Sequence, residues 1–293
     1  ERQVGIPTAV DLNVLFYNQS WARELGFSEP PSTPQDFRDQ ACKAAGANLE
    51  RSQQERQYTG TGGWLVNTSP NVSLSWMAAF DASPLLTDGS LLFESPRSVE
   101  SFTFLRDLFE QDCAWFGLSP QPFQYFAERM ALFYSGNLTD ILTQDATNTR
   151  LGSKDEWTIL PYPAVDNTPQ VVSNALAYAL LAGEPADELA AWLVMRWLLQ
   201  PEHHLAVIRE LGSLPVHRSA IESLGEFEVL HPQWSEAVNW GYDRTSPPPV
   251  AEWLIASRLL EDFSWQVFQA NVTAADIPTF LEDLDDQLES MTR

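Results

Sequence analysis

Strand-like apolar segments alternate with amphipathic helical segments along this chain, and this alternation restricts its fold most. In residues 8–18 nearly every second residue is apolar, which is the period of a β-strand. Residues 95–111 begin with Ser95 and Pro96, a helix start signal, and then place apolar side chains on one helical face. Strands that alternate with helices in this way predict an α/β protein.

Composition sets the size of the core and excludes some partners. The chain has 293 residues, of which 44% are hydrophobic, enough for one large domain or two lobes. Its net charge of -23 repels nucleic acid and anionic membranes, so we expect no nucleic-acid partner. No stretch approaches the ~20 apolar residues of a membrane span. The chain starts at Glu1 without a signal segment, so its location cannot be read directly.

The motifs of common enzyme classes are absent from the sequence. There is no G-x-S-x-G, H-E-x-x-H, P-loop or G-x-G-x-x-G motif. Glu202, His203 and His204 could suggest a metal, but adjacent histidines on a helix point to different faces. We therefore expect no metal, no cofactor and no enzymatic activity. A pair of carboxylates for glycoside hydrolysis stays open among the 40 acidic residues.

Seven segments, in order, resemble the sugar-binding branch of the bacterial solute-binding proteins, the relatives of maltose-binding protein. They are GIPTAVDLNVLFYN, PPSTPQDFRDQACKAA, LLFESPRSVESFTFLRDLFEQ, FAERMALFYSGN, WTILPYP, LAAWLVMRWLLQPEHH and GSLPVHRSAI. No single segment is decisive, but seven in the same order across nearly the whole chain are specific. The chain is identified on this basis as a member of that family.

The resemblance implies a two-lobe, class II periplasmic-binding-protein-like fold with a hinge. Residues 1–12 would end the N-terminal lobe, 13–165 and 214–293 would form the C-terminal lobe, and 166–213 would return to the N-terminal lobe. The family carries about a hundred further residues, domain-sized in scale, before the first of these segments. We therefore expect an incomplete N-terminal lobe whose apolar helix at 186–199 exposes large side chains.

The function implied by the resemblance is that of the substrate-binding component of an ABC importer. It would capture a sugar or oligosaccharide by hinge closure, outside the cytoplasm and with or without a lipid anchor. It would act as a monomer and deliver the solute to a membrane permease. The alternatives are a glycerol-phosphate-type polyol as the solute or, as a different class, a carbohydrate-processing enzyme.

The resemblance also suggests ligand contacts, because sugars stack on aromatic rings and hydrogen-bond to carboxylates and amides. Asp11 takes the position of an acidic ligand contact with Asn13 beside it, although a hinge carboxylate that caps a backbone turn fits equally. Trp76 is expected to stack on the ring. Trp64 is a second candidate, for which a core position is the favoured interpretation. Asn137 and Asn174 are expected to face the cleft.

A late loop, WGYDRTSPPPVAEW, supplies the last candidates. Trp253 takes the position of a ligand aromatic, with helix packing as the alternative, and Tyr242 and Arg244 precede it. Arg244 is the basic residue that a phosphate-bearing solute would need.

The two cysteines, Cys42 and Cys113, are either buried thiols or one disulfide. Both lie near ends of expected helices in the same lobe. We predict a disulfide, which requires an oxidising compartment.

Overall fold

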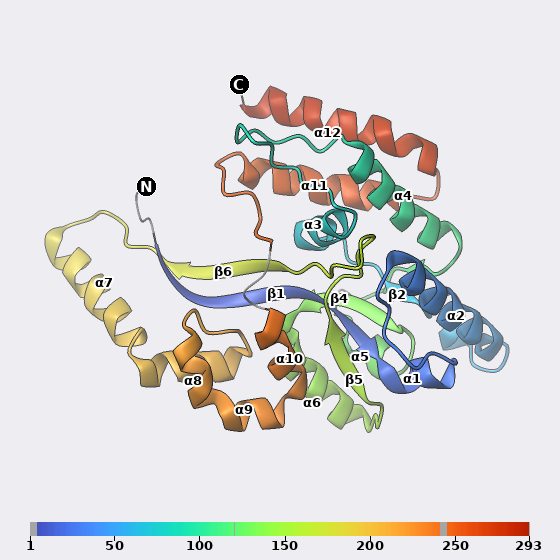
Figure 1. The fold of residues 1–293 in the computed structure, drawn as a ribbon, viewed down its shortest axis with the longest axis horizontal. Coiled ribbons are helices and arrows are strands. Elements are labelled where there is room, and N and C mark those ends of the chain that lie inside the picture. Colours follow the sequence, from blue (N-terminus) through green and yellow to red (C-terminus); the bar gives the residue numbers. More distant parts are fainter. Residues whose placement is uncertain (1–4, 120, 241–244, 293) are drawn as a thin grey trace.

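The structure, a computed structural model, describes residues 5–119, 121–240 and 245–292 (Figure 1). Its strands are β1 (Ile6–Asn18), β2 (Trp64–Leu65), β3 (Ala114–Trp115), β4 (Phe133–Asn137), β5 (Trp157–Leu160) and β6 (Val172–Tyr178). Its helices are α1 (Gln19–Glu24), α2 (Pro34–Ser52), α3 (Pro70–Ala79), α4 (Pro96–Glu110), α5 (Phe123–Ala127), α6 (Ile141–Leu151), α7 (Pro185–Leu198), α8 (Pro201–Leu211), α9 (Gly225–Leu230), α10 (Pro232–Trp240), α11 (Trp253–Val267) and α12 (Ile277–Thr292). Short 3₁₀ turns are η1 (Arg56–Tyr58), η2 (Leu138–Asp140), η3 (Arg218–Leu224) and η4 (Ala274–Asp276). The predicted α/β class is confirmed.

All the strands form one mixed sheet around β1. The strand order is β3-β2-β4-β1-β5, and β6 also pairs with β1. β1 is antiparallel to β4, β5 and β6, whereas β2 is parallel to both β3 and β4. The first half of β1 pairs with β6, and its second half pairs with β4 and β5. Asn13 is the residue where the two halves meet, in register with Asn137 and Val172.

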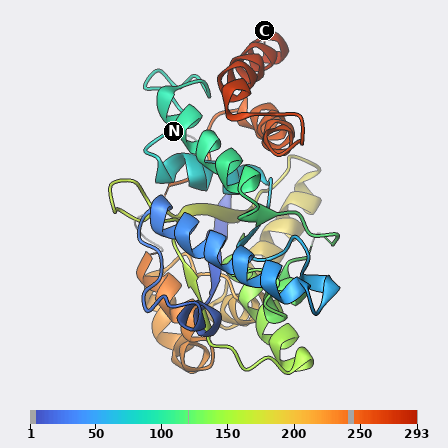
Figure 2. The same cartoon turned by 90° about the vertical axis from the view of Figure 1, so that its right-hand side faces the viewer.

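Alternation along β1 builds a hydrophobic cluster on each face of the sheet. Helices lie on both sides of the sheet in Figure 2. Leu15 and Tyr17 point into the first cluster, which packs against α2, α3, α4, α11 and α12. Val14 and Phe16 point into the second cluster, which packs against α6, α8, α9 and α10. Because side chains of a strand alternate between faces, one continuous strand serves both clusters.

Segments far apart in sequence meet at the middle of β1. Val10 and Leu214 exchange backbone hydrogen bonds of 2.9 and 2.8 Å. Tyr162 donates its hydroxyl to Asn13 Oδ1 at 2.8 Å, and its backbone pairs with Gln170. Two later segments of the chain, near residues 162 and 214, therefore contact the middle of β1, and the segment near residue 170 pairs with the first of them.

Helix α7 projects from the rest of the chain in Figure 1. This helix, the end of β6 and the loop between them carry many exposed apolar side chains. These are Leu176, Leu180, Leu181, Leu189, Trp192, Leu193, Val194 and Trp197. Trp192 and Trp197 are 43% and 52% exposed, as the sequence predicted for this helix. None of the described helices combines the length and apolar composition that a membrane crossing requires.

Candidate functional site

A cavity of about 660 Å³ lies where β2, β3 and β4 end. These three strands are parallel, so the loops that follow them leave the same edge of the sheet. Open α/β sheets bind ligands at this carboxyl edge. The cavity is lined by Asn13, Leu65, Val66, Asn67, Thr68, Ser69, Asn71, Phe116, Gly117, Ser119, Gln121, Pro122, Phe123, Tyr134, Ser135, Gly136, Asn137, Asp140 and Trp265.

Side-chain hydrogen bonds hold the loops around this cavity in place. Asn67 donates to the Ser135 carbonyl at 3.1 Å and accepts from the Ser69 amide at 2.9 Å, which joins the loop after β2 to β4. Asn137 and Asp140 form a reciprocal capping box at the start of η2. Such caps satisfy the free amides of a helical turn, so the rim of the cavity is ordered before any solute binds.

Asn13 lines the cavity but uses its polar atoms inside the protein. Its side chain is almost fully buried, and Oδ1 accepts from Ser75 Oγ at 3.0 Å and from the Tyr162 hydroxyl at 2.8 Å. Nδ2 donates to the Gly136 carbonyl at 3.2 Å. Both lone pairs of Oδ1 are occupied, so the described role of Asn13 is to join β1, α3 and β4.

Asp11 has the capping arrangement that the sequence left as one of two possibilities. Its Oδ1 accepts from the backbone amides of Leu12 at 2.9 Å and Thr139 at 3.2 Å, and Oδ2 accepts from Thr139 Oγ1 at 2.9 Å. Burial raises the pKa of Asp11 to about 6, against the lowering effect of these hydrogen bonds, and the nearby Asp140 adds to the rise. Asn174 lies across from it on β6.

Replacing Asp11 by asparagine is expected to stabilise the protein at neutral pH but not at pH 4. A raised pKa in the folded state means that folding binds protons between pH 4 and 6. The free energy of unfolding therefore falls as pH rises through this window. Above pH 6 the ionised carboxylate costs up to about 3 kcal/mol, which Asp11→Asn removes. Urea unfolding of both proteins from pH 4 to 8 measures this.

The matched control is Asp283→Asn on the exposed side of α12. It changes the net charge by the same amount, and we expect no pH-dependent difference from it. A constant difference between Asp11→Asn and the original protein across this pH range would contradict the interpretation.

The structure corrects the expectation that Trp76 stacks on a ligand. Its ring is 0% exposed and lies against Phe37, Trp64, Phe104 and Tyr162 in the first cluster. A solute cannot reach a ring that is covered on all sides. The ligand role of Trp64 is wrong for the same reason, and its core interpretation is confirmed: its indole nitrogen donates to Ser135 Oγ at 3.2 Å.

The exposed tryptophan at this cavity is Trp265 rather than Trp253. Trp253 begins α11 and packs, partly buried, against the first cluster. Trp265 lies near the other end of α11, is 53% exposed and contacts the Phe116 ring edge-on at 5.0 Å between centroids. The available sequence signal was its position off the buried stripe formed by Ala256, Leu260, Phe263 and Val267.

The charge on the described cavity wall is negative. Asp140 is the carboxylate among the described residues that line the cavity, and these residues include no lysine or arginine. Burial raises the pKa of Asp140. Tyr242 and Arg244 lie outside the described residues. Within the described ranges, no cluster of three or more histidine, cysteine or acidic side chains could hold a metal.

Solved structures with a similar fold are bacterial binding proteins. The maltose-bound MalE3 of T. maritima has a TM-score of 0.77 and 15% identity, covering 98% of this chain and 72% of its own. UgpB of Mycobacterium tuberculosis, in complex with glycerophosphocholine, has a TM-score of 0.78 and 14% identity, covering 99% and 71%. The sugar-binding protein MalE of Xanthomonas citri has a TM-score of 0.74 and 18% identity, covering 98% and 71%.

These likenesses establish the fold, which is that of two-lobe periplasmic binding proteins. No curated protein sequence matches the chain significantly. Residues 2–239 match the family described as bacterial extracellular solute-binding protein, and this span is most of the chain. The chain therefore belongs to the bacterial extracellular solute-binding protein family.

Proposed function

We propose that the protein is the substrate-binding component of an ABC importer and that it captures a neutral sugar or oligosaccharide. The observation that carries this proposal is the 660 Å³ cavity at the carboxyl edge of β2, β3 and β4, in a chain of this family. Relatives of the same fold bind maltose and a cyclic maltosyl-maltose. A cavity of this volume accommodates a small saccharide.

The chemistry of the cavity suits a polyhydroxylated ring. Trp265 and Phe116 offer aromatic surface to the C–H face of a sugar, and the amides of Asn67 and Asn71 can pair with hydroxyls. A polar group at such a wall favours solutes that can complete its hydrogen bonds. Asp140 adds one acceptor for hydroxyl donors.

Hinge closure is part of the proposal. In the proposed closure, residues 13–165 and 214–293 form one lobe. Residues 1–12 and 166–213 belong to the other lobe, and β1 connects the two. A solute held between the lobes would favour the closed form because it contacts both lobes only in that form. The membrane permease would then recognise the closed form. Asp11, Asn137, Asn174 and Trp253, together with Tyr242 and Arg244, remain candidate contacts in it.

A glycerophosphodiester is the second candidate solute, because one structural relative binds glycerophosphocholine. A phosphate needs cationic partners, and the described cavity wall has a carboxylate instead. The sugar is therefore the favoured solute. Stronger binding of glycerophosphocholine than of maltose would reverse this order.

We further propose that the protein has no enzymatic activity and works as a monomer outside the cytoplasm. Among the described residues that line the cavity, Asp140 is the one carboxylate, and both oxygens of the neighbouring Asp11 already accept hydrogen bonds from Leu12 and Thr139, which argues against a carboxylate pair for glycoside hydrolysis. The disulfide between Cys42 and Cys113 supports an oxidising compartment. Release of free sugar from maltotriose during long incubation would refute the non-enzymatic proposal.

The test of the proposed function is isothermal titration calorimetry with maltose, maltotriose, tagatose and glycerophosphocholine. Replacing Trp265 by alanine is expected to weaken binding of the best solute by about 1–3 kcal/mol, the scale of one large apolar contact. Its melting temperature without solute should stay the same, because the side chain is 53% exposed.

Trp197→Ala is the matched control, since Trp197 on α7 is 52% exposed and lies outside the cavity wall. It should leave affinity unchanged. Equal losses in both variants, or no loss in Trp265→Ala, would place the site elsewhere. If no solute of the panel binds the unmodified protein, the sugar proposal fails.

A further inference from the structure

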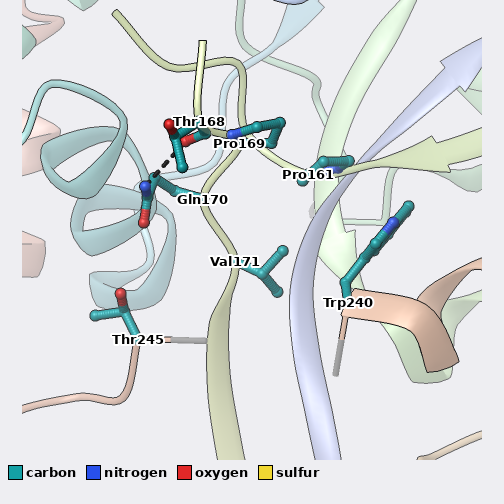
Figure 3. Close-up of a pocket in the computed structure, with 7 residues that line it drawn as sticks. All are labelled: Pro161, Thr168, Pro169, Gln170, Val171, Trp240 and Thr245. Carbon is teal, nitrogen blue, oxygen red and sulfur yellow. Dashed lines mark hydrogen bonds between the residues drawn. The ribbon is translucent and has the colours of Figure 1, made fainter. Parts of the chain in front are cut away.

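A second cavity, of about 450 Å³, lies where the chain passes between β5, β6 and α10 (Figure 3). It is lined by Pro161, Thr168, Pro169, Gln170, Val171, Trp240 and Thr245. None of these residues lines the first cavity. The volume is within the range of small-molecule sites in proteins.

The second cavity lies beside β6 and α10, whereas the first lies where β2, β3 and β4 end. Val171 and Trp240 pack with Val10 and Leu12 in the second hydrophobic cluster. Asn13, which lines the first cavity, points to the other face and bonds to Ser75 of α3. A solute in the first cavity therefore does not occupy the second.

Among the described lining residues, the walls of the second cavity are apolar and its rim is polar and uncharged. Pro161, Pro169, Val171 and Trp240 supply the apolar surface, and Val171 points toward Trp240 in Figure 3. The Gln170 amide turns back and donates to the Thr168 carbonyl at 2.9 Å. No described lining residue is ionisable. Burial of a charge here would be costly, so the wall suits a neutral ring compound with one hydrogen-bonding group.

We propose that this cavity is a second binding site, for a small uncharged ring compound, and that its occupant shifts the hinge equilibrium. Pro161 and Trp240 lie on one side of the lobe division proposed above, and Pro169 and Val171 lie on the other. An occupant that touches Trp240 on one side and Val171 on the other fixes the separation of these two side chains, and so favours one hinge angle. By linkage, it then changes the affinity for the solute, and the solute changes its affinity equally. The proposed coupling between the occupant of this cavity and the solute rests on the proposed function.

Backbone hydrogen bonds among the lining segments make most of the cavity wall firm. Thr245 donates its amide to the Val171 carbonyl at 2.9 Å and accepts from the Ser173 amide at 2.9 Å. Tyr162 and Gln170 exchange backbone bonds of 2.9 and 3.0 Å beside Pro161. These bonds hold the lining segments at residues 161, 170–171 and 245 together, so an occupant would act on the hinge through its contact with Trp240 on α10, which these bonds do not include.

Indole is the probe for the site itself, because it is neutral, flat and has one N–H donor. We expect saturable binding of indole to the full chain by NMR titration, and a loss of about tenfold or more in Trp240→Ala, which removes the aromatic wall. Trp192→Ala on α7 is the control and should bind indole normally. No saturable binding, or equal binding to Trp240→Ala and the original protein, overturns the site.

Thr168→Trp tests the coupling without risk to the core, because Thr168 is exposed at the rim. The new side chain should fill the cavity, abolish indole binding and change the affinity for the best solute by about threefold or more. Unchanged solute affinity with indole binding abolished overturns the coupling and leaves the site standing. If no solute binds the unmodified protein, the proposed function and the coupling both fail, whereas the indole titration still decides the site.

Discussion

Replacing Gly63 by alanine is expected to lower the free energy of unfolding by about 2–5 kcal/mol, a large part of the stability of a typical domain. Gly63 has φ +57°, where an L-residue loses about 1–2 kcal/mol. A Cβ atom there would lie 2.0 Å from the Cys113 carbonyl oxygen and 2.8 Å from that of Ala41. Because these neighbours are backbone atoms, β2 and β3 would have to separate, and overpacking of this kind adds about 1–3 kcal/mol. Urea unfolding followed by circular dichroism measures the loss.

Gly60→Ala separates the two causes. Gly60 also has a positive φ, +69°, but an added Cβ meets no atom within 4 Å. It should therefore lose only the conformational part, about 1–2 kcal/mol. Equal losses for both variants would mean that the neighbours of Gly63 relax without cost. The comparison also tests the site indirectly, since the Gly63 carbonyl accepts from the amides of Leu132 and Phe133, which lead into β4.

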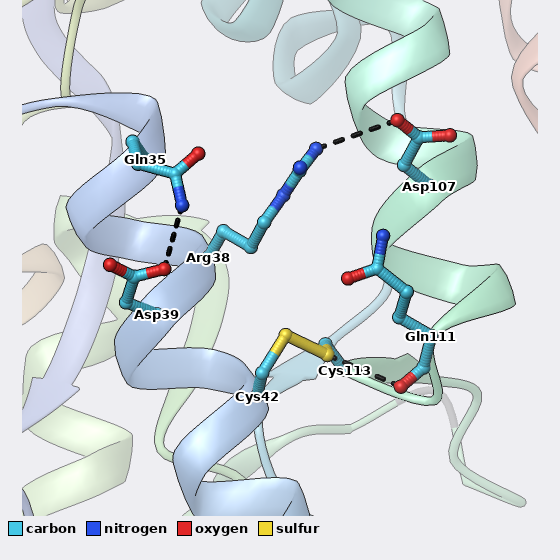
Figure 4. Close-up of a disulfide and its surroundings, with 7 residues drawn as sticks. All are labelled: Gln35, Arg38, Asp39, Cys42, Asp107, Gln111 and Cys113. Carbon is cyan, nitrogen blue, oxygen red and sulfur yellow. Dashed lines mark hydrogen bonds and ion pairs between the residues drawn. A yellow bond between two sulfur atoms is a disulfide. The ribbon is translucent and has the colours of Figure 1, made fainter.

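The second large effect is expected from removing the disulfide between Cys42 and Cys113 (Figure 4). The bond joins α2 to the residue before β3, across a sequence separation of 71. A closed loop of this length reduces the entropy of the unfolded chain, and in the chain-entropy model this stabilises the fold by about 4 kcal/mol. The double variant Cys42→Ala with Cys113→Ala should unfold at correspondingly lower urea concentration.

Reduction supplies the control for this prediction. A reductant should destabilise the original protein to about the level of the double variant and leave the double variant unaffected. The ion pair between Arg38 and Asp107, at 3.6 Å, also joins α2 to α4 and stays in both proteins. Two reactive thiols in the unfolded, unreduced protein would show that the bond is absent.

Much of the fold could be predicted from local pattern. The period of two in residues 8–18 corresponds to β1, and the caps at Thr33 and Ser95 begin α2 and α4 as expected. These features depend on neighbours within a few residues, where propensity and capping decide the structure. The order of the strands depends on contacts between distant segments, and local pattern does not predict it.

The site was harder to predict because burial depends on tertiary neighbours. Trp76 lies in the second half of α3 and not at its opening, and residues 72–77 of this helix are all buried, since neighbouring elements cover it from several sides. Asn13 and Asn137 do lie at the cavity, but their polar atoms hold neighbouring segments and helical caps. The sequence did not indicate Trp265, because its place at the cavity depends on its contact with Phe116, which is distant in sequence.

The position of β1 determines how the protein responds to tension. Hydrogen bonds of antiparallel strands run perpendicular to the strand direction. β1 is bonded in this way to β6 along its first half and to β4 and β5 along its second half. A pulling force along β1 loads these bonds in shear, so they must rupture together. A force that peels β6 from the edge breaks its bonds one after another, so the molecule is mechanically anisotropic, with β1 as its stiff axis.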